Sequence, residues 1–261
     1  MVRTVRTPLI HRVMLLCGFC AVAVLLATAW PVSAVPLENH EEKESNLKKQ
    51  ATGGLFKKWT FDADEANAVP AGFSPLSLDE GSQAAWTVAP EATAPSAPNV
   101  VAVTSGCDGA SCFRLLVAQG LEYEYPDLAV RFRSGNDSTG VGGMVFGVKN
   151  ARNFYAALVD LGSRSAQVIR MVDGAITVLG QTPVTLKAID WHSLRVQRNT
   201  IISKDFIETF VDGVLVLSVE DQALGTGQVG LSTQGKTSLL FDTFHAVPLF
   251  SHRPLSSPAA Y

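Results

Sequence analysis

Two Asp-Gly dipeptides, each lying between two short apolar runs, constrain the fold of this chain more than any other feature. They are Asp173-Gly174 and Asp212-Gly213. A two-residue hairpin turn requires positive φ, which glycine adopts without steric cost, so an Asp-Gly pair between apolar runs predicts a β-hairpin. The sequence therefore predicts at least two hairpins in its second half.

The rest of the central region also has the pattern of short strands. Leu128, Val130 and Phe132 alternate with Ala129, Arg131 and Arg133, which is the period of a half-buried strand. About a dozen runs of this kind follow one another at turn spacing, and no long window has a helical stripe. We therefore expect an all-β fold, an antiparallel sandwich of two sheets.

The N-terminal segment, residues 1–34, has the order of an export signal. Arg3, Arg6 and Arg12 precede an apolar run that ends at Pro31, and Ala34 completes a small-residue cleavage site. We expect cleavage after Ala34 and an extracytoplasmic location, periplasmic or secreted. The alternative is an uncleaved anchor, because the apolar run can nearly span a bilayer. Only in that case would a membrane be a partner.

The charge of the chain argues against a nucleic-acid partner. The net charge is −3, and it becomes −6 when the three arginines of residues 1–34 leave with the signal. A protein that binds nucleic acid instead needs a basic surface. The sequence predicts a charged linker at 35–54, one β-sandwich domain at 55–249 and a Ser/Pro-containing tail at 250–261.

Two of the four cysteines, Cys107 and Cys112, remain after removal of the signal. They flank a short turn-rich stretch, and an oxidising compartment favours a disulfide between them. A thiol–metal site is the less favoured alternative, because a zinc site needs three or four protein ligands and no histidine lies nearby.

The region from Trp59 to Val247 contains the motifs Trp59–Asp62, Gly142–Phe146, Asn153–Ala157, Val172–Gly174, Trp191–Val196, Phe210–Gly213, Gly227–Thr233 and Phe241–Phe244. In these motifs and their order it resembles the concanavalin A-like lectin/glucanase superfamily. Within it, the chain looks closest to the 3-keto-disaccharide hydrolase domain, which is glycoside hydrolase family 16-like. The resemblance implies a jelly-roll of two curved sheets, and the family name implies action on a modified sugar.

The acidic motif of glycosidases with this fold, Glu-x-Asp-x-Glu, is not present. That spacing directs three carboxylates to one face of a strand, where two of them act as nucleophile and general acid. The nearest sequence is Glu122-Tyr123-Glu124, which has only two acids and is followed by Pro126. The catalytic residues are therefore unknown, and whether the chain is an enzyme is left open.

Polar and aromatic side chains on the expected strands are candidates for binding a saccharide on the concave face. Each one could also be an ordinary solvent-facing residue, and Trp191 could be a core residue at one end of the sandwich. The candidates are Tyr155, Arg131, Arg133, Arg170, Glu208 and Trp191.

Three aspartates are candidates for a structural calcium ion. Asp62 and Asp64 follow the first strand and Asp242 lies on the last, and these strands are neighbours in the resembled fold. Jelly-roll carbohydrate modules that the chain resembles hold calcium there, and calcium prefers carboxylate and carbonyl oxygens. The alternative is that the three acids simply end strands.

Three functions follow as hypotheses. The favoured one is an exported lectin-like module that binds a carbohydrate or polysaccharide without catalysis. The second is a hydrolase acting on a 3-keto-disaccharide or another glycoside. The third is an envelope module for protein interaction.

Overall fold

The structure is a computed structural model that describes residues 56–77, 86–103, 109, 111–135, 139–187 and 189–249. The chain divides into two compact units, Met1–Lys43 and Glu44–Tyr261, and all described residues belong to the second. The predicted signal, linker and tail (1–34, 35–54 and 250–261) lie outside the described residues. None of the described residues forms a helix that could cross a membrane.

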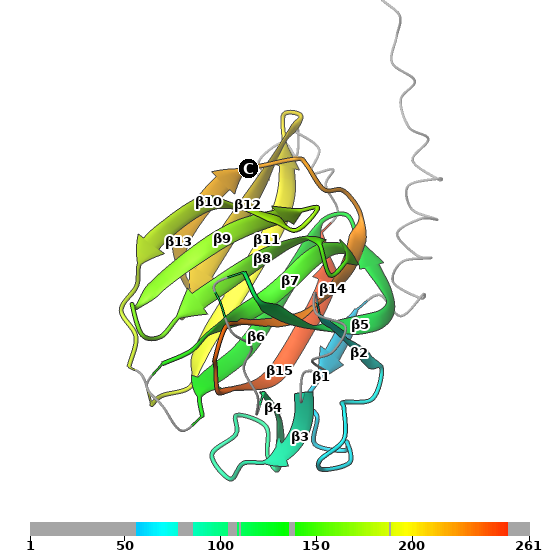
Figure 1. Ribbon diagram of the computed structural model, residues 1–261, viewed down its shortest axis with the longest axis vertical. Coiled ribbons are helices and arrows are strands. Elements are labelled where there is room, and N and C mark those ends of the chain that lie inside the picture. Colours follow the sequence, from blue (N-terminus) through cyan, green and yellow to red (C-terminus); the bar gives the residue numbers. More distant parts are fainter. Residues whose placement is uncertain are drawn as a thin grey trace, which may run out of the picture. The chain divides into compact units, whose positions relative to one another are not determined.

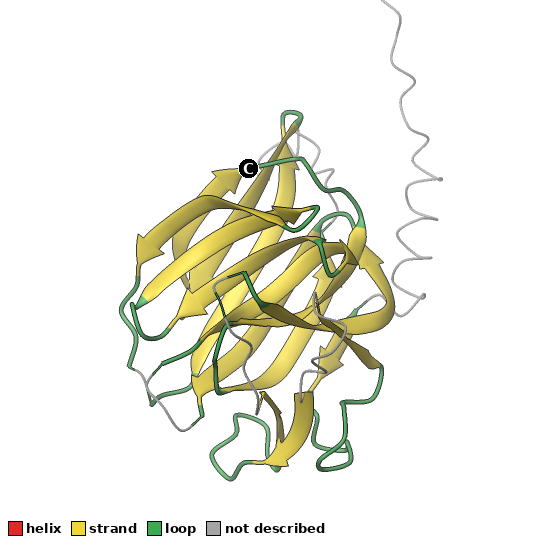
Figure 2. Ribbon diagram, viewed as in Figure 1, coloured by secondary structure: helices red, strands yellow, loops and turns green. Residues whose placement is uncertain are grey.

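The described chain consists of strands and loops, without a helix (Figure 2). The all-β prediction is therefore confirmed. The strands are β1 (Lys57–Trp59), β2 (Phe73–Ser77), β3 (Trp86–Pro90), β4 (Asn99–Val103), β5 (Phe113–Tyr123), β6 (Pro126–Ser134), β7 (Val141–Asn150), β8 (Asn153–Asp160), β9 (Ser165–Val172), β10 (Ala175–Pro183), β11 (His192–Ile201), β12 (Lys204–Val211), β13 (Val214–Glu220), β14 (Gly227–Gln234) and β15 (Leu239–Pro248).

The strands form two antiparallel sheets that lie over one another (Figure 1). The eight-stranded sheet has the order β13-β12-β11-β6-β15-β4-β3, with β1 also paired to β15. The seven-stranded sheet has the order β10-β9-β8-β7-β14-β5-β2. Neighbouring strands in both sheets are often far apart in sequence, as expected for a jelly-roll.

The main core lies between the two sheets and is made by alternate residues of both. Trp86, Phe132, Phe146, Phe241 and Phe244 are all fully buried there. Their large apolar area is the main favourable contribution to folding.

Both predicted hairpin turns are confirmed. Asp173-Gly174 joins β9 to β10 and Asp212-Gly213 joins β12 to β13, and all four residues have positive φ. A third turn of this kind, Ile202-Ser203 between β11 and β12, was not predicted because it contains no glycine. Positive φ is strained for a β-branched residue such as isoleucine.

The outward face of the seven-stranded sheet is apolar. Strand alternation places a second cluster of apolar side chains there, opposite to those of the main core. These side chains are buried, so this face of the sheet is not open to a sugar. The buried members of this cluster are Phe113, Leu115, Val117, Val145, Val148, Phe154, Ala156, Leu158, Ile169 and Met171.

Candidate functional site

The outward face of the eight-stranded sheet is polar where β6, β11 and β12 run side by side. Strand β6 alternates strictly between buried and partly exposed residues, so Arg131 and Arg133 point outward. We call this surface the polar face. Its central residues are Asp127, Arg131, Arg133, Arg195, Gln197 and Glu208.

One end of the polar face is a cluster around Trp191, which directly precedes β11. The guanidinium carbon of Arg133 lies 5.1 Å from the centre of the Trp191 ring, a cation–π distance. The Arg133 side chain also donates a hydrogen bond of 2.9 Å to the carboxylate of Glu91. The Trp191 indole N–H lies 3.5 Å from the hydroxyl of Thr93. An aromatic ring and several planar polar groups therefore meet at one place.

Glu91 is held in its ionised form in this cluster. Hydrogen bonds from the hydroxyl and backbone N–H of Thr93, together with the nearby Arg133, lower the pKa of the Glu91 carboxyl below its ordinary value. A general acid for glycoside hydrolysis needs the opposite shift. The environment of Glu91 thus suits hydrogen bonding better than proton transfer.

The middle of the polar face contains a second arginine–carboxylate pair. Arg195 donates two hydrogen bonds to Asp127, of 2.8 and 2.6 Å, and Gln197 donates a third, of 2.8 Å. The Arg195 guanidinium also lies 5.6 Å from the Phe210 ring centre. This bidentate geometry is the stronger form of an arginine–carboxylate contact.

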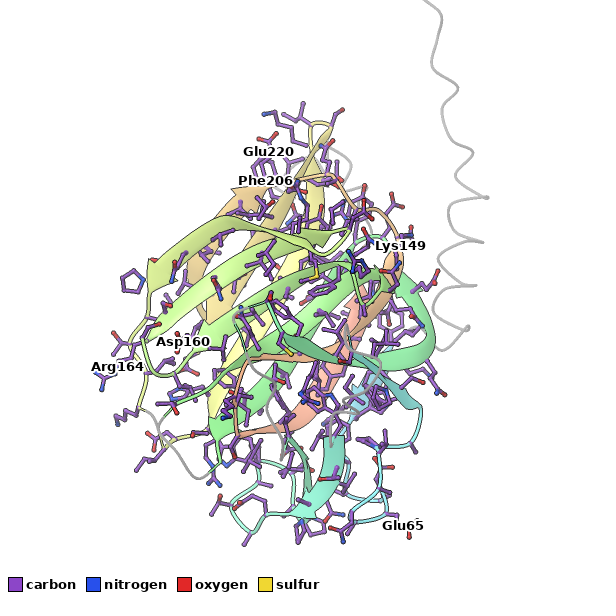
Figure 3. All side chains as sticks on the ribbon, viewed as in Figure 1. Glu65, Lys149, Asp160, Arg164, Phe206 and Glu220 are labelled. Atoms are coloured by element: carbon purple, nitrogen blue, oxygen red, sulfur yellow. The ribbon has the colours of Figure 1, made fainter. Side chains whose placement is uncertain are left out.

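The far end of the polar face contains Glu208, which accepts a hydrogen bond of 3.2 Å from the Asn199 amide. Beyond it, Phe206 of β12 pairs with Glu220 of β13, and the two side chains lie close together (Figure 3). The structure therefore brings four of the six predicted binding residues, Arg131, Arg133, Trp191 and Glu208, to one face. Their binding of a ligand stays a prediction.

The other two predicted binding residues, Tyr155 and Arg170, lie elsewhere. The Tyr155 side chain is fully buried in the core between the sheets, with its ring stacked on Phe146. Its hydroxyl donates a hydrogen bond to Asp221 and accepts one of 3.0 Å from the backbone N–H of Leu224. Arg170 pairs with the same Asp221 carboxylate. Tyr155 therefore has no exposed ring to offer a sugar.

The environment of Tyr155 is that of a structural residue. Burial, with the adjacent Asp221 carboxylate, raises the pKa of the Tyr155 hydroxyl to about 12. The hydroxyl is therefore protonated at neutral pH and can donate its hydrogen bond. Together with Arg170, it fixes the segment between β13 and β14 to the seven-stranded sheet.

Two of the three predicted calcium ligands are close together. The Ser96 backbone N–H donates to the Asp242 carboxylate, and the Ser96 hydroxyl donates to the Asp62 carboxylate, both at 2.6 Å. The Asn99 amide contacts the backbone carbonyls of Asp62 and Asp64, at 3.2 and 3.4 Å. Carboxylates and carbonyls are the oxygen ligands that calcium prefers, but each of these four groups already accepts a hydrogen bond from Ser96 or Asn99.

The two carboxylates differ in their electrostatics. Burial raises the pKa of Asp242, which is fully buried, and the charge of Asp62 adds to this rise. Burial also acts to raise the pKa of Asp62, but hydrogen bonds from Ser96, Thr60 and Asn99 outweigh it and lower that pKa. Asp64 does not complete a three-carboxylate cluster, since no group of three or more metal-ligating side chains occurs among the described residues. A calcium ion here would be held by the side chains of Asp62 and Asp242.

Calcium is expected to raise the melting temperature by several degrees, because a ligand that binds only the folded state stabilises it. The measurement is thermal unfolding in calcium compared with a chelator. Asp242→Asn should remove the calcium-dependent difference, whereas Asp160→Asn, at the end of β8, should keep it. The same melting temperature with calcium and with chelator would dismiss the calcium site.

The predicted disulfide stays a prediction. Cys112 is buried immediately before β5. Cys107 lies outside the described residues.

Sequence reasoning missed several residues of the polar face. Asp127 and Arg195 could have been found, because they continue the strand alternation that identified Arg131. Glu91 and Thr93 could not, because they follow β3 at its end and in a loop, where no periodicity reports the direction of a side chain.

Comparison with known proteins places the fold but not the family. No protein-family model matches the chain, and no curated protein matches it in sequence. Carbohydrate-binding module CBM66 from Bacillus subtilis is 16% identical, with a TM-score of 0.52 over 67% of this chain and 95% of that one. A Bacillus subtilis protein of unknown function with a galectin-like fold is 8% identical, with a TM-score of 0.50 over 74% and 97%.

At these identities the likeness shows the fold alone. The chain is a lectin-like jelly-roll sandwich of two antiparallel sheets. The finer resemblance to the 3-keto-disaccharide hydrolase domain stays a prediction.

Proposed function

We propose that this protein is a carbohydrate-binding module that acts outside the cytoplasm and binds a glycan on the polar face without catalysis. The observation that carries the proposal is the cluster in which Trp191, Arg133, Glu91 and Thr93 meet. Sugar recognition combines apolar contact with a ring and hydrogen bonds to hydroxyl groups, and this cluster offers both. The extracytoplasmic location is the one predicted from residues 1–34.

The two sheets support the choice of face. The second face of the seven-stranded sheet carries a buried apolar cluster, whereas the eight-stranded sheet presents guanidinium, carboxylate and amide groups at strand spacing. Planar groups of this kind can donate to and accept from vicinal hydroxyl groups. Residues of the polar face are also held in place by one another, which lowers the entropy lost on binding.

The pairing of the carboxylates favours binding over hydrolysis. Glycoside hydrolysis uses two carboxyl groups, one of them protonated, on either side of the scissile bond. On the polar face, Asp127 is bound by Arg195 and Glu91 by Arg133. Of Asp127, Glu91 and Glu208, only Glu208 forms no ion pair among the described residues; it accepts a hydrogen bond from Asn199. The two paired carboxylates suit a hydrogen-bond acceptor better than a nucleophile or an acid.

Trp191→Ala is expected to weaken glycan binding about tenfold, which is about 1.4 kcal/mol, and Glu208→Gln is expected to weaken it less. The measurement is isothermal titration calorimetry after a polysaccharide pull-down has identified a ligand. Ile176→Ala, which removes an exposed apolar side chain from the other sheet, is the control and should bind normally. Melting temperatures of all variants would separate loss of binding from loss of folding.

Two outcomes would contradict the proposal. One is no binding across a broad panel of neutral and acidic polysaccharides, which would leave protein interaction as the better hypothesis. The other is release of sugar from a 3-keto-disaccharide or another glycoside, detected by chromatography, which would make the chain an enzyme.

A further inference from the structure

The polar face carries three arginines, and they are not equivalent. Arg133 is paired with Glu91, and Arg195 is paired with Asp127. Arg131 lies on β6 between these two pairs, opposite Ser193 of β11. Among the described residues, Arg131 forms no ion pair, so its charge has no counter-ion on this face.

The hydrogen bonding of Arg131 is also incomplete. One terminal nitrogen, Nη2, donates a bond of 3.1 Å to the backbone carbonyl of Trp191. The Nε–H is buried and has no hydrogen-bond partner in the part of the chain that the structure describes. A guanidinium has five N–H donors; the buried Nε–H is not accessible to a ligand, but the terminal N–H groups other than the one bonded to Trp191 have no protein partner among the described residues.

The acid nearest to Arg131 in the sheet does not neutralise it. Asp242 of β15 is opposite Arg131 in register, but the strand bulges at this point. The Asp242 carboxylate instead accepts hydrogen bonds from the backbone N–H groups of Ser96 and Thr243. Of the three arginines of the polar face, Arg131 is thus the one without an ion pair among the residues that the structure describes.

The position of Arg131 relates this charge to the aromatic part of the site. Its hydrogen bond to the Trp191 carbonyl holds the guanidinium beside the residue proposed to contact a sugar ring. In a uronic acid the carboxylate is attached directly to the ring. A sugar that lies against Trp191 can therefore bring its carboxylate to Arg131, and a planar guanidinium matches a planar carboxylate.

We propose that the glycan is acidic and that Arg131 binds the carboxylate of a uronic acid residue. The inference rests on the proposed function, because it assigns the ligand class of the same site. Arg131 then determines specificity, while Trp191 and the paired residues bind the sugar ring and its hydroxyl groups.

The experiment compares glycans that differ only in charge. Polygalacturonate and alginate are each titrated beside their methyl esters, which keep the backbone and remove the carboxylate charge. The wild-type protein is expected to bind at least one of the acids about tenfold more tightly than its ester, and salt should reduce that preference. Arg131→Gln should abolish the preference for the acid over its ester.

The control variant removes the same positive charge at a residue that lies away from the polar face. Arg164 is exposed in the turn after β8 (Figure 3), and Arg164→Gln should keep the full preference for the acid.

A preference that persists in Arg131→Gln would overturn the role of Arg131. Equal or tighter binding of the esters, or binding that requires a sulfated glycan such as dextran sulfate, would overturn the uronate proposal while leaving glycan binding intact. Failure to bind any glycan would overturn the proposed function itself.

Discussion

Replacing Arg198 with methionine is expected to lower the free energy of unfolding by about 3–5 kcal/mol, because it leaves a buried carboxylate without its cation. Arg198 lies on β11 and points into the sandwich, and its side chain is 3% exposed. It donates a hydrogen bond of 2.6 Å to Asp205, whose side chain is 10% exposed. Its guanidinium also lies 5.8 and 5.5 Å from the ring centres of Tyr125 and Tyr155.

Arg195→Met is the matched control for this prediction. It makes the same substitution three residues earlier on the same strand, and it also breaks an ion pair with an aspartate. The Arg195 side chain, however, is 47% exposed, so its loss should cost about 1 kcal/mol or less. Urea unfolding followed by tryptophan fluorescence gives both values.

A second variant tests the cause of the loss. Adding Asp205→Leu to Arg198→Met removes the unpaired carboxylate and should recover part of the lost stability. Equal losses for Arg198→Met and Arg195→Met would show that burial does not govern the strength of this pair.

Gly230→Ala is expected to destabilise the fold by at least about 3 kcal/mol, because a single added methyl group has no space. A Cβ atom at this position would lie 2.1 Å from the carbonyl oxygen of Leu116 and 2.8 Å from the Cα of Val117, both in β5. These are backbone atoms, so no side chain can turn aside. Gly230 also lies at the point where β14 shifts register against both β5 and β7.

Gly225→Ala is the control, since nothing lies within 4 Å of the added atom and the glycine does not have positive φ. Its stability should be equal to wild type or slightly higher. Thermal unfolding by circular dichroism measures both variants. A melting temperature for Gly230→Ala close to that of Gly225→Ala would mean that β5 can move away from β14.

The sequence predicts the direction of a side chain only where apolar and polar residues alternate along the strand. Strand β6 is buried on one face only, so its pattern predicted the direction of Arg131 and Arg133. Strand β8 is buried on both faces, since apolar layers lie on either side of it. Its run of apolar residues therefore contained no information about which face Tyr155 occupies.

Turns show the same dependence on local chemistry. The Asp-Gly pairs predicted their hairpins because glycine accepts positive φ. Ile202-Ser203 forms the same kind of turn because the pairing of β11 with β12 imposes it against the local preference. This pairing is local in sequence, but no glycine marks its turn. The loop that brings Glu91 and Thr93 to Trp191 is different, because the Trp191–Thr93 contact joins residues 98 positions apart, which a short window of sequence cannot contain.

The strand order determines when the polar face can form as the chain is synthesised. Strand β6 is hydrogen-bonded to β11 on one side and to β15 on the other, so Ala129 pairs with both Arg195 and His245. Its two neighbours are synthesised long after it. The polar face is therefore complete only when the end of the domain has been made and inserted, and a chain interrupted before β15 has β6 but not the surface. Affinity for a glycan on this face would report the integrity of the whole sandwich rather than of any one hairpin.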